Sequence, residues 1–386
     1  MNNFLIMTEA KFELIGHRGA PNLRPEHTYE SYLLAFQQDA DYIEFDVMPS
    51  KDGVLMVTHS FELTEISNVA SVSKFSDRKK TKVVDKKSYS GWFIEDFTAS
   101  ELQELRLRER YPQARTTKFD DIFVMPTLET ALDYIIAITP NNSSKIKLYI
   151  ETKHPTYFAS ALNVDVNQLL VNVLEKYHYL EYTMFQSFEI SSMTSIRTIL
   201  SNKNIQPLGY VMLLVANGSQ IDNGRNFDEY LTEEGIDTAK SAGITGFGPA
   251  WKMVTKPWVE SVHKRNLIIH PYTYRPEEYF LKQTPYTTFS DFIKSALELG
   301  VDGVFTEDID QTRAIVLAYE SNSVVTVLLI VAFVFVGVLF IVIAASVLSA
   351  YLCKRKTNPS SSATQNREER AGLAQQSNSY SYNQDE

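Results

Sequence analysis

Residues 42–58 read YIEFDVMPSKDGVLMVT, which is two short apolar runs joined by a polar connection. A parallel crossover needs a dozen or more residues, and the connection Met48–Gly53 is shorter than that. The two runs must therefore pair as an antiparallel hairpin. Asp52-Gly53, within the connection, is a strong hairpin turn signal. The second run is consequently an added hairpin arm rather than a strand of a parallel sheet.

Similar apolar runs recur along residues 12–316 and alternate with longer amphipathic stretches. In chain order they are Phe12–Gly16, Tyr42–Val47, Val54–Thr58, Ile146–Thr152, Thr183–Phe188, Leu208–Leu214, Ile244–Gly248, Leu267–Tyr272 and Gly303–Thr306. Most are separated by about 20 to 35 residues, the spacing of βα units around a parallel sheet. Without the hairpin arm eight runs remain, which is the strand number of a TIM barrel. The predicted fold class is therefore α/β, a TIM (β/α)8 barrel.

The alternation of runs breaks between about residues 60 and 127. Lys79–Lys87 is basic and polar, and Gly91-Trp92-Phe93 carries aromatic residues of an exposed type. We expect a small insertion on the top face of the barrel, because loops of this length usually serve as functional lids or walls.

Composition excludes several classes of protein. The 386 residues are 44% hydrophobic and 22% charged, which argues against disorder of the whole chain. The net charge of 37 − 47 = −10 makes the chain a poor generic nucleic-acid binder, since phosphate affinity rests on clustered Lys and Arg. The lone cysteine, Cys353, excludes an internal disulfide framework and a cysteine-based zinc site.

A long apolar segment near the end of the chain predicts one transmembrane helix. Val324–Leu352 holds 29 residues without a charge, and a bilayer core needs about 20. Lys354-Arg355-Lys356 follows at once, so the positive-inside rule makes the tail, residues 353–386, cytoplasmic. The large N-terminal part is then extracellular or lumenal. The tail is polar and lacks an aliphatic cluster, and we expect it to be disordered.

The start of the chain disagrees with this topology. Met1–Met7 has neither a basic region nor a long apolar run, so no signal peptide is visible. Either the N-terminus is incomplete, or the C-terminal helix is the sole insertion signal and the catalytic part stays in the cytosol. The charge rule favours the outward topology.

Polar residues cluster at the ends of the apolar runs, where barrel active sites lie. They are His17, Arg18, Glu44, Asp46, His59, Glu151 and Lys153. Glu44 and Asp46 share one face of a strand, because side chains alternate along it. Two carboxylates in an apolar strand are costly unless they hold a cation, and oxygen ligands favour Ca²⁺ or Mg²⁺. Histidines suit acid–base catalysis, and Arg and Lys suit a phosphate oxyanion.

Together these residues point to metal-assisted cleavage of a phosphodiester. Each has a plainer interpretation: a strand-end histidine is often structural, and Glu44 and Asp46 could form ion pairs with Arg18 or Lys153. The combined pattern is stronger evidence than any single member.

The chain also resembles the glycerophosphodiester phosphodiesterase family over about residues 12–316. The matching motifs are Gly16-His17-Arg18-Gly19-Ala20-Pro21, Pro25-Glu26-His27-Thr28, Tyr42–Val47, Lys51-Asp52-Gly53 leading to His59, Tyr149–Pro155 and Gly300–Thr306. Ser90–Phe93, Asp96-Phe97-Thr98 and Pro126–Glu129 resemble its periplasmic-type branch, which has an insertion of this kind. The C-terminal transmembrane helix would be an addition to that pattern.

The resemblance implies a TIM barrel that cleaves substrates such as glycerophosphocholine to sn-glycerol 3-phosphate and an alcohol through a cyclic phosphate. The implied metal ligands are Glu44, Asp46 and Glu151, and the implied general acid–base pair is His17 and His59. Arg18 and Lys153 would bind the phosphate, with Glu26 in the substrate shell. The periplasmic-type branch is usually associated with calcium, so Ca²⁺ is expected, with Mg²⁺ as the alternative.

Two residues depart from the family pattern. His27 stands where the family has Asn, which brings a third histidine near the site. Ser60 stands where the family usually has Asp, which removes a negative charge beside His59. Neither change deletes an implied ligand, so activity should survive.

Two other functions compete with glycerophosphodiester hydrolysis. One is a lysophospholipase D-like phosphodiesterase acting on lysophospholipids, which membrane tethering would favour. The other is a catalytically inactive barrel serving as a membrane receptor. The expected partners are a small-molecule substrate and a lipid bilayer, with no nucleic acid, and the sequence predicts no oligomeric state.

Overall fold

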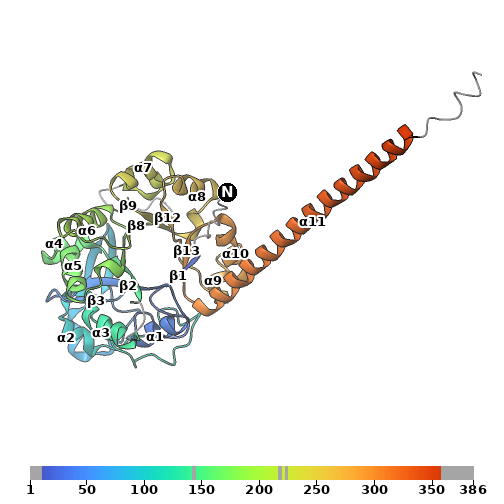
Figure 1. Cartoon of the computed structure of the whole chain (residues 1–386). Coiled ribbons are helices and arrows are strands. Elements are labelled where there is room, and N and C mark those ends of the chain that lie inside the picture. Colours follow the sequence, from blue (N-terminus) through green and yellow to red (C-terminus); the bar gives the residue numbers. More distant parts are fainter. Residues whose placement is uncertain (1–10, 141–144, 216–219, 222–224, 358–386) are drawn as a thin grey trace, which may run out of the picture. The chain divides into compact units, whose positions relative to one another are not determined.

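The computed structural model describes residues 11–140, 145–215, 220–221 and 225–357 (Figure 1). The chain divides into two compact units, with the boundary between Tyr319 and Glu320. The first unit holds the barrel, and the second begins within the last helix. The predicted tail lies almost entirely outside the described residues.

Eight parallel strands form the barrel of the first unit. They are β1 (Glu13–Gly16), β2 (Tyr42–Pro49), β6 (Lys147–Thr152), β7 (Thr183–Ser187), β8 (Gly209–Leu214), β11 (Gly246–Pro249), β12 (Ile268–Ile269) and β13 (Gly303–Thr306). Their order in the sheet is β12-β11-β8-β7-β6-β2-β1-β13. Backbone bonds from Asp302 N to Ile269 O (3.0 Å) and from Phe305 N to Pro271 O (3.0 Å) link the two ends. The predicted TIM barrel is confirmed.

The short β3 (Leu55–Val57) pairs antiparallel with β2, with Val47 opposite Val57. The turn between them is closed by hydrogen bonds from Gly53 N to Ser50 O (3.0 Å) and from Ser50 N to Val54 O (2.9 Å). Gly53 has a φ of +77°, which an L side chain rarely adopts. The predicted hairpin and its Asp-Gly turn are therefore confirmed.

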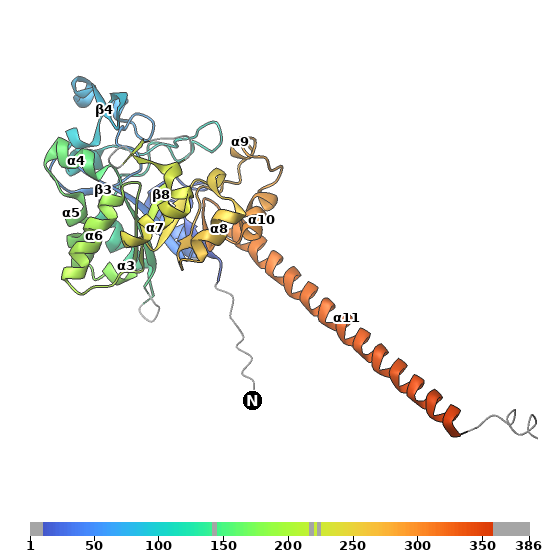
Figure 2. The ribbon, with the colours of Figure 1, turned by 90° about the horizontal axis from the view of Figure 1, so that it is seen from above.

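Helices cover the outside of the barrel, as Figure 2 shows in a second view. The α-helices described before the last one are α1 (Tyr29–Gln37), α2 (Ala99–Glu104, in the insertion), α3 (Leu128–Ile138), α4 (Pro155–Leu162), α5 (Val166–Lys176), α6 (Ile190–Asn202), α7 (Glu233–Ser241), α8 (Lys256–His263), α9 (Glu278–Leu281) and α10 (Phe289–Leu299). Short 3₁₀ helices lie at Val69–Ser71, Ser73–Arg78, Ile94–Asp96, Leu180–Tyr182, Phe227–Leu231 and Trp251–Met253. One large apolar cluster fills the space between the helices and the strands.

The segment between β3 and α3 is a small substructure of its own. It contains α2 and a hairpin of β4 (Lys80–Val84) and β5 (Lys87–Gly91). The expectation of exposed aromatic residues here is wrong, because Trp92 is 7% exposed and Phe93 is fully buried. Trp92 Nε1 donates a hydrogen bond to Phe75 O (2.6 Å), so these rings are the core of the segment rather than its surface.

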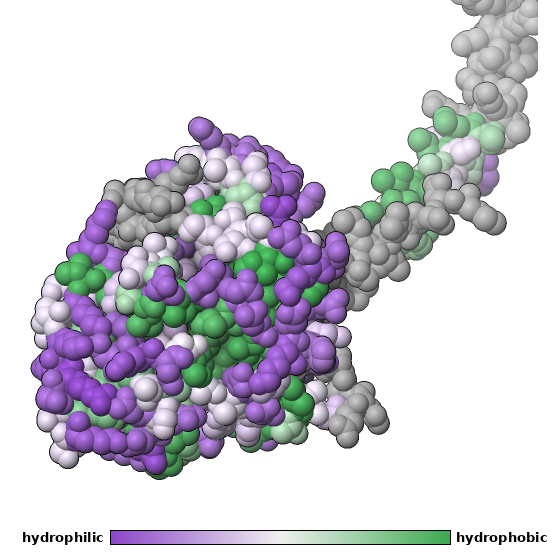
Figure 3. Space-filling view, turned by 90° about the vertical axis from the view of Figure 1, so that its left-hand side faces the viewer, coloured by the Kyte–Doolittle hydropathy of each residue, from purple (hydrophilic) through white to green (hydrophobic). Residues whose placement is uncertain are grey.

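The last helix, α11 (Ile309–Thr357), leaves the barrel and continues into the second unit. Within it, Ala332–Lys354 is long and apolar enough to cross a membrane, with a mean hydropathy of 2.7. Its large side chains are exposed, for example Phe333 (80%) and Phe335 (73%), and Figure 3 shows apolar residues along it in green. A soluble protein rarely leaves such a patch uncovered, which agrees with the predicted transmembrane segment.

Candidate active site

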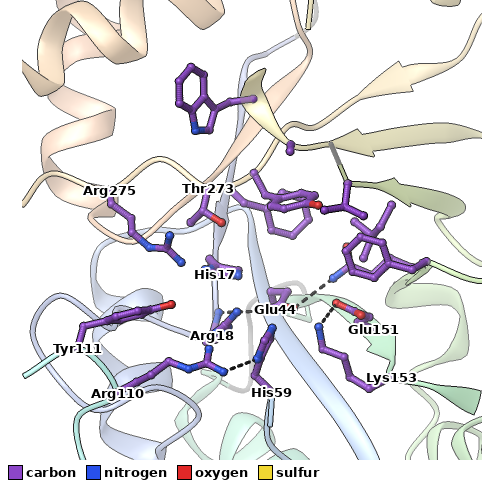
Figure 4. Close-up of a pocket in the computed structure, with 18 of the residues that line it drawn as sticks. His17, Arg18, Glu44, His59, Arg110, Tyr111, Glu151, Lys153, Thr273 and Arg275 are labelled. Atoms are coloured by element: carbon purple, nitrogen blue, oxygen red, sulfur yellow. Dashed lines mark hydrogen bonds and ion pairs between the residues drawn. The ribbon is translucent and has the colours of Figure 1, made fainter. Parts of the chain in front are cut away.

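A cavity of about 580 Å³ opens at the carboxyl ends of the barrel strands (Figure 4). The sequence-predicted residues that line it are His17, Arg18, Glu44, His59, Glu151 and Lys153. They come from β1, β2, the end of the β3 arm and β6, which are far apart in sequence. Barrel active sites occupy this face, because the loops after the strands meet there. Asp46 and Glu26 are not among the lining residues and lie behind the cavity wall.

Three carboxylates and one imidazole meet at the cavity, with Glu44 and Glu151 in its lining and Asp46 and His27 outside it. Asp46 and Glu151 are direct neighbours in the register of the parallel strands β2 and β6. Ligand atoms of His27, Glu44 and Asp46 all lie within 4.8 Å of one another. His27 Nε2 donates a 2.9 Å hydrogen bond to Asp46 Oδ2, and its Nδ1 lies 3.0 Å from Tyr32 Oη. The family departure at position 27 therefore supplies an imidazole that holds an acidic side chain in place.

The loop after β1 adds contacts to the same carboxylates. Arg18 has a left-handed backbone conformation (φ 58°), which points its N–H at Glu44 Oε2, 2.7 Å away. Its guanidinium donates to Glu26 Oε2 at 2.6 Å and lies 3.4 Å from Asp46. Glu26 thus orients Arg18 from behind rather than facing the cavity. Gln186, on β7, donates to Glu44 Oε1 at 3.2 Å.

Lys153 bridges two of the acids. Its Nζ lies 2.7 Å from Glu151 Oε2 and 3.2 Å from Asp46 Oδ1. Among the described residues, Glu151 Oε1 is buried and accepts no hydrogen bond, and Asp46 Oδ1 has only the 3.2 Å ion-pair contact with Lys153 Nζ. Buried carboxylate oxygens without donors are costly, and they are the ligands that hard cations take. The donor set therefore fits a divalent cation.

The surroundings of these acids raise the pKa of Glu44 and Glu151 and lower that of Asp46. Burial and repulsion by Asp46 raise the pKa of Glu44, and burial raises the pKa of Glu151 to about 8 against the pull of Lys153. The pKa of Asp46 is lowered despite burial, because Lys153 and His27 lie beside it. A positive charge between the carboxylates would relieve this repulsion.

His17 is held by an acid at the other end of the chain. Its Nδ1 lies 2.7 Å from Glu307 Oε1, and Glu307 directly follows β13. Glu307 Oε2 also accepts hydrogen bonds from Arg115 and from Arg275 Nε (2.9 Å). Burial would raise the pKa of Glu307, but Arg275 and Arg115 hold it well below its usual value, so Glu307 is an anion. Burial and Arg18 lower the pKa of His17 to about 4.

His59 is held by an arginine from the insertion. Arg110 Nη2 lies 2.7 Å from His59 Nδ1 and 2.5 Å from Ser60 Oγ. Ser60, where the family usually has Asp, therefore accepts from Arg110. Burial, with Arg18, Lys153 and Arg110 nearby, lowers the pKa of His59 well below its usual value.

Comparison with known proteins gives the family. The family model described as glycerophosphoryl diester phosphodiesterase matches residues 17–311. The chain belongs to this family. It is 30% identical to a glycerophosphodiester phosphodiesterase of Arabidopsis thaliana over 76% of this chain and 82% of that protein. It is 27% identical to one of Haemophilus influenzae over 76% of this chain and 86% of that protein.

Solved structures agree with the barrel. An Oleispira antarctica phosphodiesterase, solved in complex with its product sn-glycerol-3-phosphate, matches with a TM-score of 0.57 at 16% identity. The match covers 79% of this chain and 96% of that one. A glycerophosphodiester phosphodiesterase from Agrobacterium tumefaciens gives 0.53 at 18% identity, covering 79% and 100%. The family match, with curated relatives 27–30% identical over most of the chain, makes this protein a glycerophosphodiester phosphodiesterase, an enzyme.

The two histidines of this glycerophosphodiester phosphodiesterase are set as opposite tautomers. A carboxylate only accepts, so Glu307 requires a proton on Nδ1 of His17 and leaves its Nε2 as a lone pair. An arginine only donates, so Arg110 requires a lone pair on Nδ1 of His59 and leaves the proton on Nε2. One neutral imidazole can accept a proton from a substrate, while the other can donate one.

A second cavity of about 450 Å³ adjoins the first one. Both are lined by His59, Glu65, Arg110, Glu151, Lys153, Phe188 and Val215. His17 lines the first cavity alone. The two spaces therefore meet at His59 and the Glu151–Lys153 pair, with the insertion forming the far side of the second.

Sequence reasoning assigned no role to three groups that contact the predicted site. Glu307 follows the apolar run Gly303–Thr306, and the same strand-end position marked His17 and Glu151, so a signal existed. Gln186 also ends a run, but no role followed from its motif. Arg110 lies in the insertion, where no local pattern singles it out, and its contact with His59 arises from folding alone.

Proposed function

We propose that this glycerophosphodiester phosphodiesterase hydrolyses substrates such as glycerophosphocholine in a metal-dependent reaction that yields sn-glycerol 3-phosphate and an alcohol. The observation that carries the proposal is the pair of oppositely set histidines, His17 and His59, above a group of buried carboxylates. The catalytic barrel spans residues 12–316, with the insertion at about 60–127. A transmembrane helix at 324–352 and a polar tail at 353–386 complete the proposed organisation.

The residues divide into three roles. Glu44, Asp46 and Glu151 hold the cation, with His27 orienting Asp46 from behind. Arg18 and Lys153 bind the phosphate, and Glu26 orients Arg18. His17 and His59 exchange protons with the substrate. The product bound to the Oleispira antarctica relative is the one that this reaction would release.

In the first step the glycerol 2-hydroxyl attacks phosphorus and loses its proton to His17 Nε2. The bond to the leaving alcohol breaks, and His59 donates its Nε2 proton to that alcohol oxygen. The product of this step is a cyclic phosphate. In the second step water attacks phosphorus and gives a proton to His59. The bond from phosphorus to the 2-oxygen breaks, and His17 returns its proton to that oxygen. Both histidines end as they began.

The carboxylate group favours a hard cation. A bound divalent ion would polarise the phosphoryl oxygens and offset the charge that develops on them. Carboxylate oxygens suit Ca²⁺ best, with Mg²⁺ as the alternative, because Ca²⁺ tolerates irregular arrangements of oxygen ligands. Among the described residues His27 already uses both of its nitrogens, which leaves the oxygen ligands to the ion.

A lysophospholipase D-like activity on lysophospholipids is the second candidate. Leu213, Val215 and Trp251 give the first cavity an apolar part of its lining. Such a lining would accept an acyl chain on the glycerol while the 2-hydroxyl stays free to attack. The candidate membrane span Ala332–Lys354 would bring such lipids within reach.

Membrane topology follows from the charge rule. Lys354-Arg355-Lys356 directly follows the apolar segment, so the tail would be cytoplasmic and the barrel extracellular or lumenal. Protease treatment of sealed membranes that hold the full chain tests this. Digestion of the barrel from the cytoplasmic side would contradict it.

The decisive assay uses the full chain in detergent, stripped with EDTA and then supplied with Ca²⁺ or Mg²⁺. Glycerophosphocholine and lysophosphatidylcholine are compared side by side. Release of glycerol 3-phosphate that returns with Ca²⁺ supports the first proposal and names the ion. Choline release from the lipid alone would replace it with the second candidate. Full activity in EDTA would contradict the metal assignment.

A further inference from the structure

The second cavity lies on the side of the site where the leaving alcohol would be. His59 lines both cavities, whereas His17 lines only the first. In the proposed reaction His17 acts on the glycerol 2-hydroxyl and His59 acts on the leaving alcohol. The glycerol therefore belongs in the first cavity and the alcohol in the second. This assignment rests on the proposed function.

Aromatic rings form one wall of the second cavity. Phe61 and Tyr89, both from the insertion, pack edge to face with their centroids 4.8 Å apart. Phe188, which follows β7, lies on the barrel side, and Lys153 Nζ is 5.7 Å from the centre of its ring. Aromatic faces attract ammonium groups, with the strongest effect where water is excluded.

Carboxylates of the insertion add negative charge to the same cavity. Glu62 accepts hydrogen bonds from Trp92 N (3.1 Å) and Thr64 N (3.1 Å), both neutral donors. Glu65 is exposed and lines both cavities. Within the part of the chain that the structure describes, neither acid forms an ion pair with Lys or Arg. Their charge is therefore left to face the cavity.

The two cations on the shared wall have acidic neighbours. Lys153 lies between Glu151 and Asp46, and Arg110 lies 3.6 Å from Glu26 Oε1. On the insertion side, Glu62 and Glu65 carry negative charge without an ion-pair partner among the described residues. Lys87 adds one positive charge there, with its Nζ 5.4 Å from the centre of the Tyr89 ring. Aromatic rings together with uncompensated carboxylates attract an organic cation and repel an anionic alcohol.

We propose that the second cavity is a subsite for the leaving alcohol and selects alcohols that carry an alkylammonium group, of the choline type. Phe61, Tyr89 and Phe188 contact the methyl groups, while Glu62 and Glu65 provide the field that favours the positive charge. Substrates whose alcohol is neutral, such as a sugar alcohol, still fit but bind less well. Alcohols with a free carboxylate are disfavoured.

The test measures kcat/KM of the metal-loaded full chain for two substrates of nearly the same shape. One is glycerophosphocholine, and the other is its neutral analogue in which 3,3-dimethylbutanol replaces choline. We expect the choline ester to be preferred by about tenfold, which is within the range of desolvated cation–π contacts. Free choline should also inhibit more strongly than free 3,3-dimethylbutanol.

Substitutions of residues that line the second cavity test whether this cavity causes the preference for the choline ester. Glu65→Gln, at an exposed position, should reduce the ratio of the two kcat/KM values to about threefold, and Glu65→Asp should retain most of it. Tyr89→Leu should reduce the ratio similarly. Glu104→Gln is the matched control, because Glu104 is an exposed acid of the same insertion that pairs with Lys74 and does not line the cavity. It should keep the wild-type ratio.

The outcomes distinguish failure of the subsite from failure of the proposed function. Glycerol 3-phosphate released equally fast from both substrates would overturn the subsite and leave the proposed function standing. A preference that Glu65→Gln and Glu104→Gln reduce equally would also overturn it, since a general field would then be the cause. No glycerol 3-phosphate from either substrate would overturn the proposed function and the subsite together.

Discussion

The barrel side and the insertion side of the site hold their histidines by opposite means. On the barrel side, Glu307 is an anion that accepts the Nδ1 proton of His17. On the insertion side, Arg110 is a cation that donates to Nδ1 of His59. The same side chain type is therefore prepared as a proton acceptor in one place and as a donor in the other. The role of each histidine is therefore set by the charge of the group that contacts its Nδ1.

The largest expected loss of kcat/KM follows substitution of a carboxylate that would hold the cation. Glu44→Gln should lower kcat/KM by about 10³-fold or more, because the charge that holds the cation over the phosphate is weakened. Calorimetric titration with Ca²⁺ should show loss of binding while the circular dichroism spectrum is unchanged. Glu129→Gln, which removes an exposed acid that pairs with Lys176, is the control. Full activity in Glu44→Gln would show that the site binds no catalytic ion there.

Alanine substitution of each histidine tests whether His17 accepts a proton and His59 donates one. His17→Ala and His59→Ala should each lower kcat by about 10²–10⁴-fold on glycerophosphocholine, the usual contribution of an acid or base. A nitrophenol leaving group needs no proton, so on a nitrophenyl ester the His59→Ala defect should largely vanish from the first step, measured as the initial release of nitrophenol, and persist in ring opening. The His17→Ala defect should remain. If the nitrophenyl ester rescues His17→Ala instead, the two roles are reversed.

Substitution of Glu307 or Arg110, which contact Nδ1 of the two histidines, should have intermediate effects on kcat. In Glu307→Gln the amide oxygen would accept from Arg115 and Arg275, which turns its N–H toward His17 and reverses the tautomer. We expect kcat to fall by roughly 10²-fold with little change in KM. Arg110→Met frees the tautomer of His59 and should cost roughly tenfold, again in kcat.

Arg110→Lys keeps the charge and a donor, and it should recover part of the Arg110→Met loss. Nuclear magnetic resonance of ring-labelled histidines checks the cause, since the Nδ1 and Nε2 signals separate the tautomers. Unchanged tautomers in both Glu307→Gln and Arg110→Met would show that Glu307 and Arg110 do not set the tautomers of His17 and His59.

The smallest expected effect is in the pH profile. Burial and Arg18 lower the pKa of His17 to about 4, so the proton-accepting form persists well below neutral pH. With the cation kept saturating, kcat/KM should change by less than about twofold between pH 7 and pH 5.5. An unperturbed histidine, with a pKa of about 6.5, would lose about tenfold over this range. A fall centred near pH 6.5 would show that His17 titrates normally.

Much of the fold could be predicted because it depends on local rules. Nine apolar runs correspond to the nine strands of the main sheet, and the short Met48–Gly53 connection forced one of them to be a hairpin arm. Alternation along β2 was enough to bring Glu44 and Asp46 to one face. The burial of Trp92 and Phe93 could not be predicted, because it depends on how the insertion folds on itself.

The strand count, the barrel and the residues that end its strands can be predicted from the sequence, because side-chain alternation and crossover length act over a few residues. The hydrogen-bond partner of each histidine depends on tertiary contacts. Glu307 reaches His17 across 290 residues because β13 closes the barrel beside β1. Arg110 reaches His59 because the insertion folds back over the site. Hydrogen-bond partners that are distant in sequence are chosen by closure of the fold, and here those partners set the proton on each imidazole.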